Sequence, residues 1–231
     1  MSFPVDPHAR PVLIFRWAVF LLAAAFTLRQ LVFTADYSDP GGPFRYLTIW
    51  ALLLSFFCAS RMLALTEWRS DLAWPRLVAV TAIVNGLVVF LYWRLWFQDP
   101  ALVNAGEPLP MWVSLYLHGI GAALQWFDAL VIYGAFRRPL RAVLPFVAFV
   151  VAYIAWVELF VGPMNTLPRG LETSGLPYPF LNDLTPSDRA LFYGQTAAMG
   201  LGLLGILALL ARVLGRWRQP SSASSAASPD R

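Results

Sequence analysis

The chain has 231 residues, of which 58% are hydrophobic and only 13% are charged, and its mean hydropathy is +0.60. This composition excludes an ordinary soluble domain and indicates an integral membrane protein. The formal net charge is +4, and all 17 basic residues are arginine. Cys58 is the one cysteine, which excludes an internal disulfide, and His8 and His118 are too few for a haem or an all-protein metal site. We therefore expect no cofactor and no metal.

Six apolar segments are each long enough to cross a bilayer, which takes about 20 residues in a helix. They cover approximately residues 12–33, 44–65, 77–97, 112–133, 140–161 and 190–214. Because lipid cannot satisfy the hydrogen bonds of an irregular backbone, spanning segments must be helices. We predict an all-α fold, a bundle of six transmembrane helices over residues 1–219. A disordered cytoplasmic tail rich in Ser and Ala is expected over residues 220–231.

The first segment allows two interpretations. Arg10 and Arg16 precede an apolar run that contains three consecutive alanines at residues 23–25, a pattern that also fits a cleavable signal peptide. The apolar residues continue to Phe33, however, and this extra length favours a retained helix. Cleavage would leave five helices.

Basic residues predict the orientation. With the N-terminus inside, eleven arginines lie at the cytoplasmic side, namely Arg10, Arg16, Arg61, Arg69, Arg76, Arg137, Arg138, Arg141, Arg212, Arg216 and Arg218. Five lie at the opposite side, namely Arg29, Arg45, Arg94, Arg169 and Arg189. The positive-inside rule then places both termini in the cytoplasm. If the source is bacterial, we expect the protein in the plasma (inner) membrane. The positive charge is explained by topology and implies no nucleic-acid partner.

Polar side chains gather in the outer part of the predicted bundle. Thr48 lies about 6 Å below the start of the second segment and His118 about 9 Å below the start of the fourth, at 1.5 Å per residue. Glu158 ends the fifth segment at the same side. A transmembrane Thr usually bonds to its own helix, a lone His is either a packing residue or part of a site, and Glu158 also fits an interfacial carboxylate.

Other polar residues have structural interpretations. Asn85, Gln125 and Asp128 lie deeper and are typical of polar contacts between helices. Aromatic residues near segment ends are typical of the interfacial belt, and these are Trp93, Trp96 and Trp112.

Four strings in order resemble one family. They are GGPFRYLTIW at residues 41–50, LPMWVSLYLH at 109–118, YIAWV at 153–157 and YPFLNDLTPSDRALFY at 178–193. They are similar to motifs of the androgen-induced and androgen-dependent regulator family of multi-pass membrane hydrolases, over roughly residues 16–210. The resemblance implies hydrolysis of fatty acid esters of hydroxy fatty acids, with Thr48 as the nucleophile and His118 as its general base.

The chemistry implied is coherent with the residue types. A Thr hydroxyl attacks an ester when a base takes its proton, and a neutral imidazole does so near pH 7. Pro43 suits the first position of a helix, so the amides of residues 44–46 would lack intrahelical partners and could stabilise an oxyanion. Arg45 or Arg94 would hold a substrate carboxylate, and Glu158 would orient the histidine.

A non-enzymatic protein is the competing hypothesis, either a lipid-binding scaffold or a small transporter. Inverted repeats and broken helices, which are typical of transporters, are not recognisable in the sequence. Asn85 and Asp128 nevertheless keep a transport path open as an alternative. In either case the expected partners are lipids within the bilayer, and the oligomeric state is not predicted.

Overall fold

The protein is an all-helical bundle, described here from a computed structural model that covers residues 3–103, 109–165 and 175–217. Six helical stretches are long and apolar enough to cross a membrane: Arg10–Phe33, Leu47–Thr66, Pro75–Gln98, Met111–Tyr133, Pro139–Met164 and Pro186–Trp217. The predicted fold class is confirmed, and the bounds agree with the predicted segments within a few residues. The predicted tail at residues 220–231 lies outside the described residues, as do Arg169 and Arg218.

Three stretches are single α-helices, and three change their helical form along their length. The single ones are α2 (Leu47–Thr66), α3 (Pro75–Gln98) and α9 (Pro186–Trp217). The first stretch is α1 (Arg10–Leu28) followed by a π-helical turn (Arg29–Phe33). The fourth runs through α4 (Met111–Leu115), a π-helical turn (Tyr116–Ile120), α5 (Gly121–Phe127) and a second π-helical turn (Asp128–Tyr133). The fifth joins a 3-10 turn (Pro139–Ala142), α6 (Val143–Trp156), a π-helical turn (Val157–Val161) and α7 (Gly162–Met164). Short turns connect them: Gly42–Arg45, Pro100–Leu102, Ala135–Arg137 and α8 (Pro179–Asn182).

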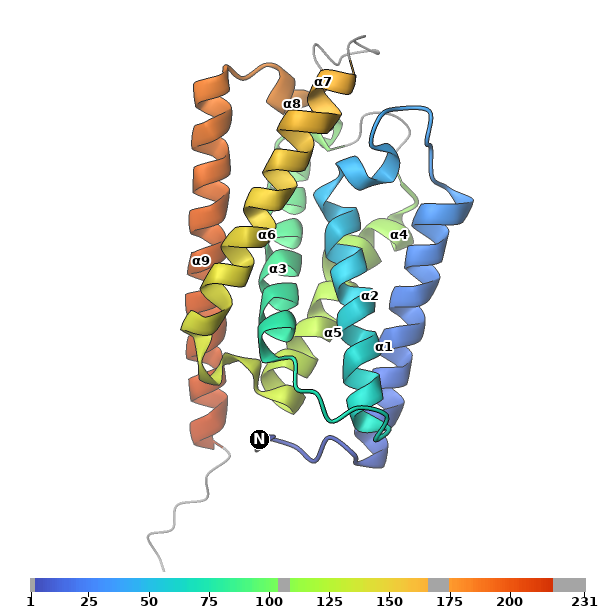
Figure 1. Ribbon diagram of the computed structural model, residues 1–231, viewed down its shortest axis with the longest axis vertical. Coiled ribbons are helices and arrows are strands. Elements are labelled where there is room, and N and C mark those ends of the chain that lie inside the picture. Colours follow the sequence, from blue (N-terminus) through green and yellow to red (C-terminus); the bar gives the residue numbers. More distant parts are fainter. Residues whose placement is uncertain (1–2, 104–108, 166–174, 218–231) are drawn as a thin grey trace, which may run out of the picture.

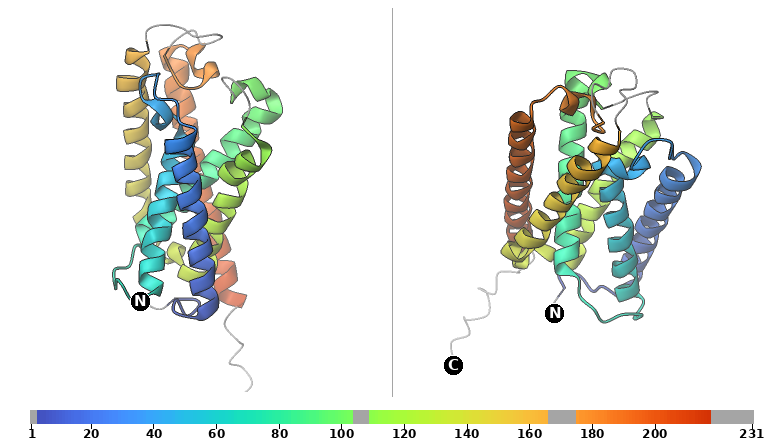
Figure 2. Two further views of the ribbon diagram at one scale, coloured as in Figure 1. Left: turned by 90° about the vertical axis from the view of Figure 1, so that its right-hand side faces the viewer. Right: turned by 45° about the horizontal axis from the view of Figure 1, so that its top comes forward.

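Helix α3 occupies the centre of the bundle, where α2, α5, α6 and α9 all contact it, whereas α1 and α9 lie at opposite edges (Figure 1). The described start of the chain and the end of α9 lie at the same end of the bundle, as expected for an even number of crossings (Figures 1 and 2). The loop that precedes α2 lies at the opposite end (Figure 1).

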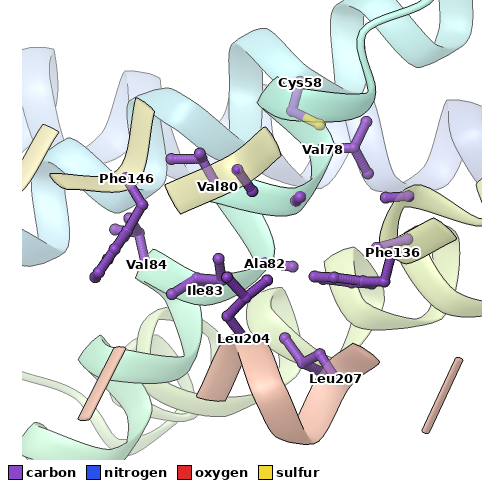
Figure 3. Packing of buried hydrophobic residues seen from close by; sticks show 14 of the residues in the cluster. Cys58, Val78, Val80, Ala82, Ile83, Val84, Phe136, Phe146, Leu204 and Leu207 are labelled. Carbon is purple, nitrogen blue, oxygen red and sulfur yellow. The ribbon is translucent and has the colours of Figure 1, made fainter. Parts of the chain in front are cut away.

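The apolar core forms around α3. Figure 3 shows Ile83 and Val84 of this helix packed with Phe146 from α6 and Leu204 from α9. Close approach of α6 and α9 depends on Gly200, because a Cβ atom there would lie 2.2 Å from the Phe146 ring. Small residues at helix contacts have this role in membranes, where burial of apolar surface gives little driving force between helices.

A buried ion pair joins three helices near the end of the bundle where the chain starts. Arg16 in α1 is 1% exposed and donates to both carboxylate oxygens of Asp128, at 3.0 and 2.7 Å. Its remaining nitrogen donates to Thr66 Oγ1 at 2.8 Å and to the Met62 carbonyl at 3.2 Å. Arg16 therefore joins helices inside the bundle. By its place in the sequence it counted among the arginines at the cytoplasmic side. Without it, ten arginines still face five on the two predicted sides.

Asn85 and Gln125 also join helices, as their depth predicted. Asn85 Nδ2 in α3 donates to Ser55 Oγ in α2 at 2.8 Å and to the Thr81 carbonyl at 2.9 Å. Gln125 Nε2 in α5 donates to the Ser55 carbonyl at 3.4 Å. Asn85 and Gln125 thus connect α2 to α3 and α5.

Replacement of one partner of the buried ion pair tests its structural role. Asp128→Asn should lower the free energy of unfolding by about 3–5 kcal/mol, because Arg16 is left buried without a counter-charge. The double change Arg16→Met with Asp128→Leu should recover most of that loss. Reversible unfolding of purified protein in mixed detergent micelles measures both. Equal stability of the single variant and the parent would contradict this role.

The predicted orientation can be tested by cysteine labelling in a Cys58→Ala background. Ser38→Cys in the loop before α2 should react with a membrane-impermeant maleimide added outside intact cells, because that loop lies at the side predicted to carry fewer arginines. Asp71→Cys in the loop between α2 and α3 should react only after the cells are permeabilised. Both side chains are exposed in the parent. The opposite pattern would invert the topology, and labelling of both sites from outside would contradict the six crossings.

Candidate active site

The start of α2 places Thr48. Gly41 and Gly42 both have positive φ angles, +83° and +46°, a backbone conformation that other residues rarely adopt. The 3-10 turn Gly42–Arg45 follows, and Tyr46 is extended with φ −96° and ψ 131°. Helix α2 therefore begins at Leu47 rather than at Pro43, and Thr48 lies in its first turn. Residues 44–46 were expected to begin the helix with free amides. They precede it instead, and the Tyr46 amide donates to the Pro43 carbonyl at 3.2 Å.

Aromatic side chains hold this turn from α2 and α6. The Phe44 carbonyl accepts the indole N–H groups of Trp50 at 2.7 Å and Trp156 at 3.1 Å. Tyr153 donates its hydroxyl to the Arg45 carbonyl at 2.9 Å. The GGPFRYLTIW and YIAWV strings are thus in direct contact, although more than 100 residues separate them in the sequence.

Tyr178 fixes the first residue of the helix. The Leu47 amide donates to the Tyr178 hydroxyl at 3.2 Å, which satisfies one of the N–H groups that a helix start leaves without a partner. Tyr178 lies in the loop before α9, and burial raises the pKa of its phenol to about 12. The phenol therefore keeps its proton across the physiological pH range.

His118 lies in the π-helical turn of the fourth stretch. Its backbone angles are φ −117° and ψ 23°, outside the helical region. Its carbonyl accepts the indole N–H of Trp93 at 2.7 Å, and its ring stacks on that of Tyr92 with the centroids 3.5 Å apart. Both partners come from α3, so the central helix positions the histidine. Trp93, which the sequence indicated as an interfacial residue, thus contributes to the site.

Thr48 and His118 face each other, as their predicted depth indicated. The distance from Thr48 Oγ1 to His118 Nε2 is 3.4 Å, and His118 is 4% exposed. On the other side of the ring, Nδ1 lies 3.1 Å from the Ser114 carbonyl. Because a carbonyl only accepts hydrogen bonds, we assign the proton to Nδ1. Nε2 then presents its lone pair to the Thr48 hydroxyl, which is the tautomer that a general base needs.

The pair lies on the wall of a large cavity of about 570 Å³. Its lining is mainly apolar and comes from α2, α3, α6, α9, the π-helical turn that contains His118 and the loops at the end of the bundle opposite the described start of the chain. The apolar lining side chains include Leu47, Val84, Leu87, Val88, Leu91, Phe149, Val150, Ile154, Phe180 and Phe192. This volume lies within the range of about 300–1,000 Å³ that is typical of small-molecule sites. An apolar ligand can therefore reach the threonine.

The other expected site residues divide between the cavity and its surroundings. Arg45 lines the cavity and forms an ion pair of 3.0 Å with Asp39. Arg94 is exposed and is not part of the lining. Glu158 accepts hydrogen bonds from Arg189 at 3.0 Å and from the Tyr193 hydroxyl at 2.8 Å. The structure therefore brings Arg45 to the site, and it places the Ser114 carbonyl rather than Glu158 at His118 Nδ1.

Sequence reasoning missed the contacts that orient the histidine. The Ser114 carbonyl lies four residues before His118, a spacing that is available to any histidine in a helix, so no residue type signals it. Trp and Tyr residues are common at membrane interfaces, so Trp93 and Tyr92 carried no specific signal. In the described part of the chain, no group of three His, Cys, Asp or Glu side chains is placed to hold a metal ion.

The fold and the site define a multi-pass membrane protein with a Thr–His pair at an apolar cavity. The chain belongs to the FAR-17a/AIG1-like protein family, whose family model matches residues 12–212. AIG1 stands for androgen-induced gene 1, so the family indicated by the four sequence motifs is confirmed. Comparisons with curated proteins and with solved structures gave no match.

Removal of the Tyr178 hydroxyl tests how the start of α2 is held. Tyr178→Phe leaves the Leu47 amide without its partner and should destabilise the protein by about 1–3 kcal/mol. Amide hydrogens of the peptide that contains residues 46–50 should exchange faster, as measured by mass spectrometry. Tyr37→Phe is the matched control, because that hydroxyl donates to the Leu31 carbonyl away from α2. Unchanged exchange in Tyr178→Phe would show that the other contacts suffice.

Proposed function

We propose that this protein is an intramembrane hydrolase of lipid esters, with Thr48 as the nucleophile and His118 as the general base. The observation that carries the proposal is the 3.4 Å contact between Thr48 Oγ1 and His118 Nε2 on the wall of an apolar cavity. Membership of the FAR-17a/AIG1-like family supports it. Contacts between catalytic groups are often loose before substrate binds, so this distance is compatible with a working pair.

Acylation would begin with attack by Thr48 Oγ1 on the ester carbonyl carbon. His118 Nε2 takes the hydroxyl proton during the attack and then gives it to the oxygen of the departing alcohol. The Ser114 carbonyl keeps the ring in one tautomer and stabilises the imidazolium that forms. Water hydrolyses the resulting acyl-threonine with His118 again as the base, and the enzyme is restored.

The amide of Thr48 itself is our candidate donor to the oxyanion. It lies in the first turn of α2, where N–H groups have no partner within the helix. The carbonyl four residues earlier, that of Phe44, already accepts two indole N–H groups. A helix N-terminus also carries partial positive charge, which favours an oxyanion.

The lining of the cavity supports one substrate class. Its apolar side chains suit an acyl chain, and Arg45 supplies a positive charge on the wall. A carboxylate on the substrate would compete with Asp39 for Arg45, whereas the exposed Arg94 is less suited. An ester of a fatty acid with a hydroxy fatty acid has both features, a long acyl chain and a free carboxylate. We propose this class as the substrate.

An active-site probe separates the hydrolase from a lipid-binding scaffold or a transporter. Purified protein in detergent is incubated with an alkyl fluorophosphonate, and the label is located by peptide mass spectrometry. The parent should carry a covalent label on Thr48, and Thr48→Ala should carry none. A parent that stays unlabelled and inactive on every ester tried would favour the scaffold.

Single and double replacements test whether the pair acts as a unit. Thr48→Ala and His118→Ala should each lower ester hydrolysis by about 10³-fold or more, and the double variant should cost little beyond either. Thr48→Ser keeps the hydroxyl and should retain some turnover. Thr27→Ala is the matched control, since this threonine of α1 is not part of the cavity lining. Parent-like activity in both alanine variants would show that the nucleophile is wrongly assigned.

A further inference from the structure

A second, smaller cavity lies beside Thr48. It accommodates the centre of a water-sized sphere over about 10 Å³, close to the space that one water molecule needs. Its lining consists of Thr48, Ala51, Leu52, Ser55, Asn85, Tyr116, Leu117 and Gly121. Thr48 also lines the large cavity. The threonine therefore has the lipid cavity on one side and this small cavity on another.

Asn85 lines this small cavity and has an unused acceptor. The residue is 6% exposed, and its Nδ2 donates to Ser55 Oγ and to the Thr81 carbonyl. The Thr81 carbonyl only accepts, so it determines which side of the amide carries the nitrogen. Oδ1 must lie on the other side, and within the described residues no donor reaches it. The Ser55 hydroxyl is not that donor, since it bonds to the Ala51 carbonyl at 2.8 Å.

The cavity follows one face of α2 between two polar groups. Ser55 lies seven residues after Thr48, which is about two turns and roughly 10 Å along the helix axis. Asn85 reaches across from α3 to Ser55, and both Asn85 and Thr48 line the same small cavity. Buried waters are found where a small cavity offers polar partners of this kind.

We propose that this cavity binds a water molecule through the Asn85 carbonyl oxygen, and that this water hydrolyses the acyl group on Thr48. The inference rests on the proposed hydrolase function. The oxygen of the water forms a bond to the acyl carbon while the bond from that carbon to Thr48 Oγ1 breaks. The water proton passes to His118 Nε2 and from there to Thr48 Oγ1, so a free acid and the intact threonine result. Asn85 is then a positioning residue.

The apolar surroundings explain why a dedicated water site is needed. An acyl chain bound in the large cavity covers the side of Thr48 from which the ester arrived. The hydrocarbon core of the bilayer supplies no bulk water at this depth. A water held beside the threonine reaches the acyl carbon without crossing the substrate.

Pre-steady-state kinetics separate the two half-reactions. Parent and Asn85→Leu, purified in detergent, are mixed with a p-nitrophenyl ester of a medium-chain fatty acid, and release of p-nitrophenol is followed. The initial burst reports acylation, and the later linear phase reports hydrolysis of the acyl-enzyme. The variant should keep the burst rate of the parent and lose about tenfold or more in the linear phase. Intact-protein mass spectrometry should then show an accumulated acyl adduct on Thr48.

Two further variants make the result specific. Gln125→Leu removes another buried amide that bonds to the same stretch of α2 but does not line the small cavity, and it should leave both phases near those of the parent. Ala51→Val fills the small cavity and leaves Asn85 in place, so it should slow the linear phase selectively. If Asn85→Leu does not fold, Ala51→Val decides the question.

The outcomes distinguish this inference from the proposed function. A merely structural role for Asn85 predicts that burst and linear phase fall together, and that result would overturn the water site while Thr48 remains the nucleophile. Turnover of the adduct at the parent rate in both Asn85→Leu and Ala51→Val would overturn it as well. If the parent forms no adduct on Thr48, the hydrolase proposal fails and the water site fails with it.

Discussion

The hydrogen bond from the Trp93 indole to the His118 carbonyl at 2.7 Å is the contact on which the site depends. The π-helical turn that contains His118 departs from regular helix geometry, and lipid cannot compensate a backbone group that loses its partner. A donor from the protein must therefore reach the carbonyl, and the central helix α3 supplies it. The same helix stacks Tyr92 on the imidazole ring. The irregular backbone and the placement of His118 thus have one common support, and π-helical turns are frequent at functional sites.

Polar interactions form two separate groups, one in each half of the bundle. At the end where the described chain starts, the Arg16–Asp128 pair ties α1 and α2 to the fourth stretch and has both partners buried. Towards the other end, hydrogen bonds to side chains determine where α2 begins and how His118 is turned. Helix α2 is common to both halves, so its position along the bundle axis relative to the fourth stretch is set at two levels. A relative displacement that separated Thr48 from His118 would also have to break either the Arg16–Asp128 ion pair or the hydrogen bonds from Arg16 to Met62 and Thr66 in α2.

The sequence predicted the six apolar helices and that Thr48 and His118 lie at one level of the bundle, because long apolar segments and their order are sufficient for both. It did not predict the start of α2. Pro43 suits a helix start as well as a 3-10 turn, and the choice is made by Tyr178 and Trp156, which lie more than 100 residues away. Arg16 was misjudged for a similar reason, since a charge near a segment end looks alike whether it faces water or a buried carboxylate. Contacts between distant residues of common types leave no local pattern.

The absence of a carboxylate at His118 Nδ1 in the structure has a physical reason. A buried carboxylate in this position would cost several kcal/mol of desolvation unless a cation and further hydrogen bonds compensated it. The Ser114 carbonyl carries no net charge and comes from the same helical stretch, so it orients the ring without that cost. The acidic residue expected for this role, Glu158, lies instead in the π-helical turn that follows α6, where Arg189 and Tyr193 compensate it. A backbone carbonyl stabilises an imidazolium less than a carboxylate does, so the pair should be a weaker base than an acid-assisted one. The proposed hydrolase should therefore turn over more slowly than an enzyme whose histidine is paired with a carboxylate.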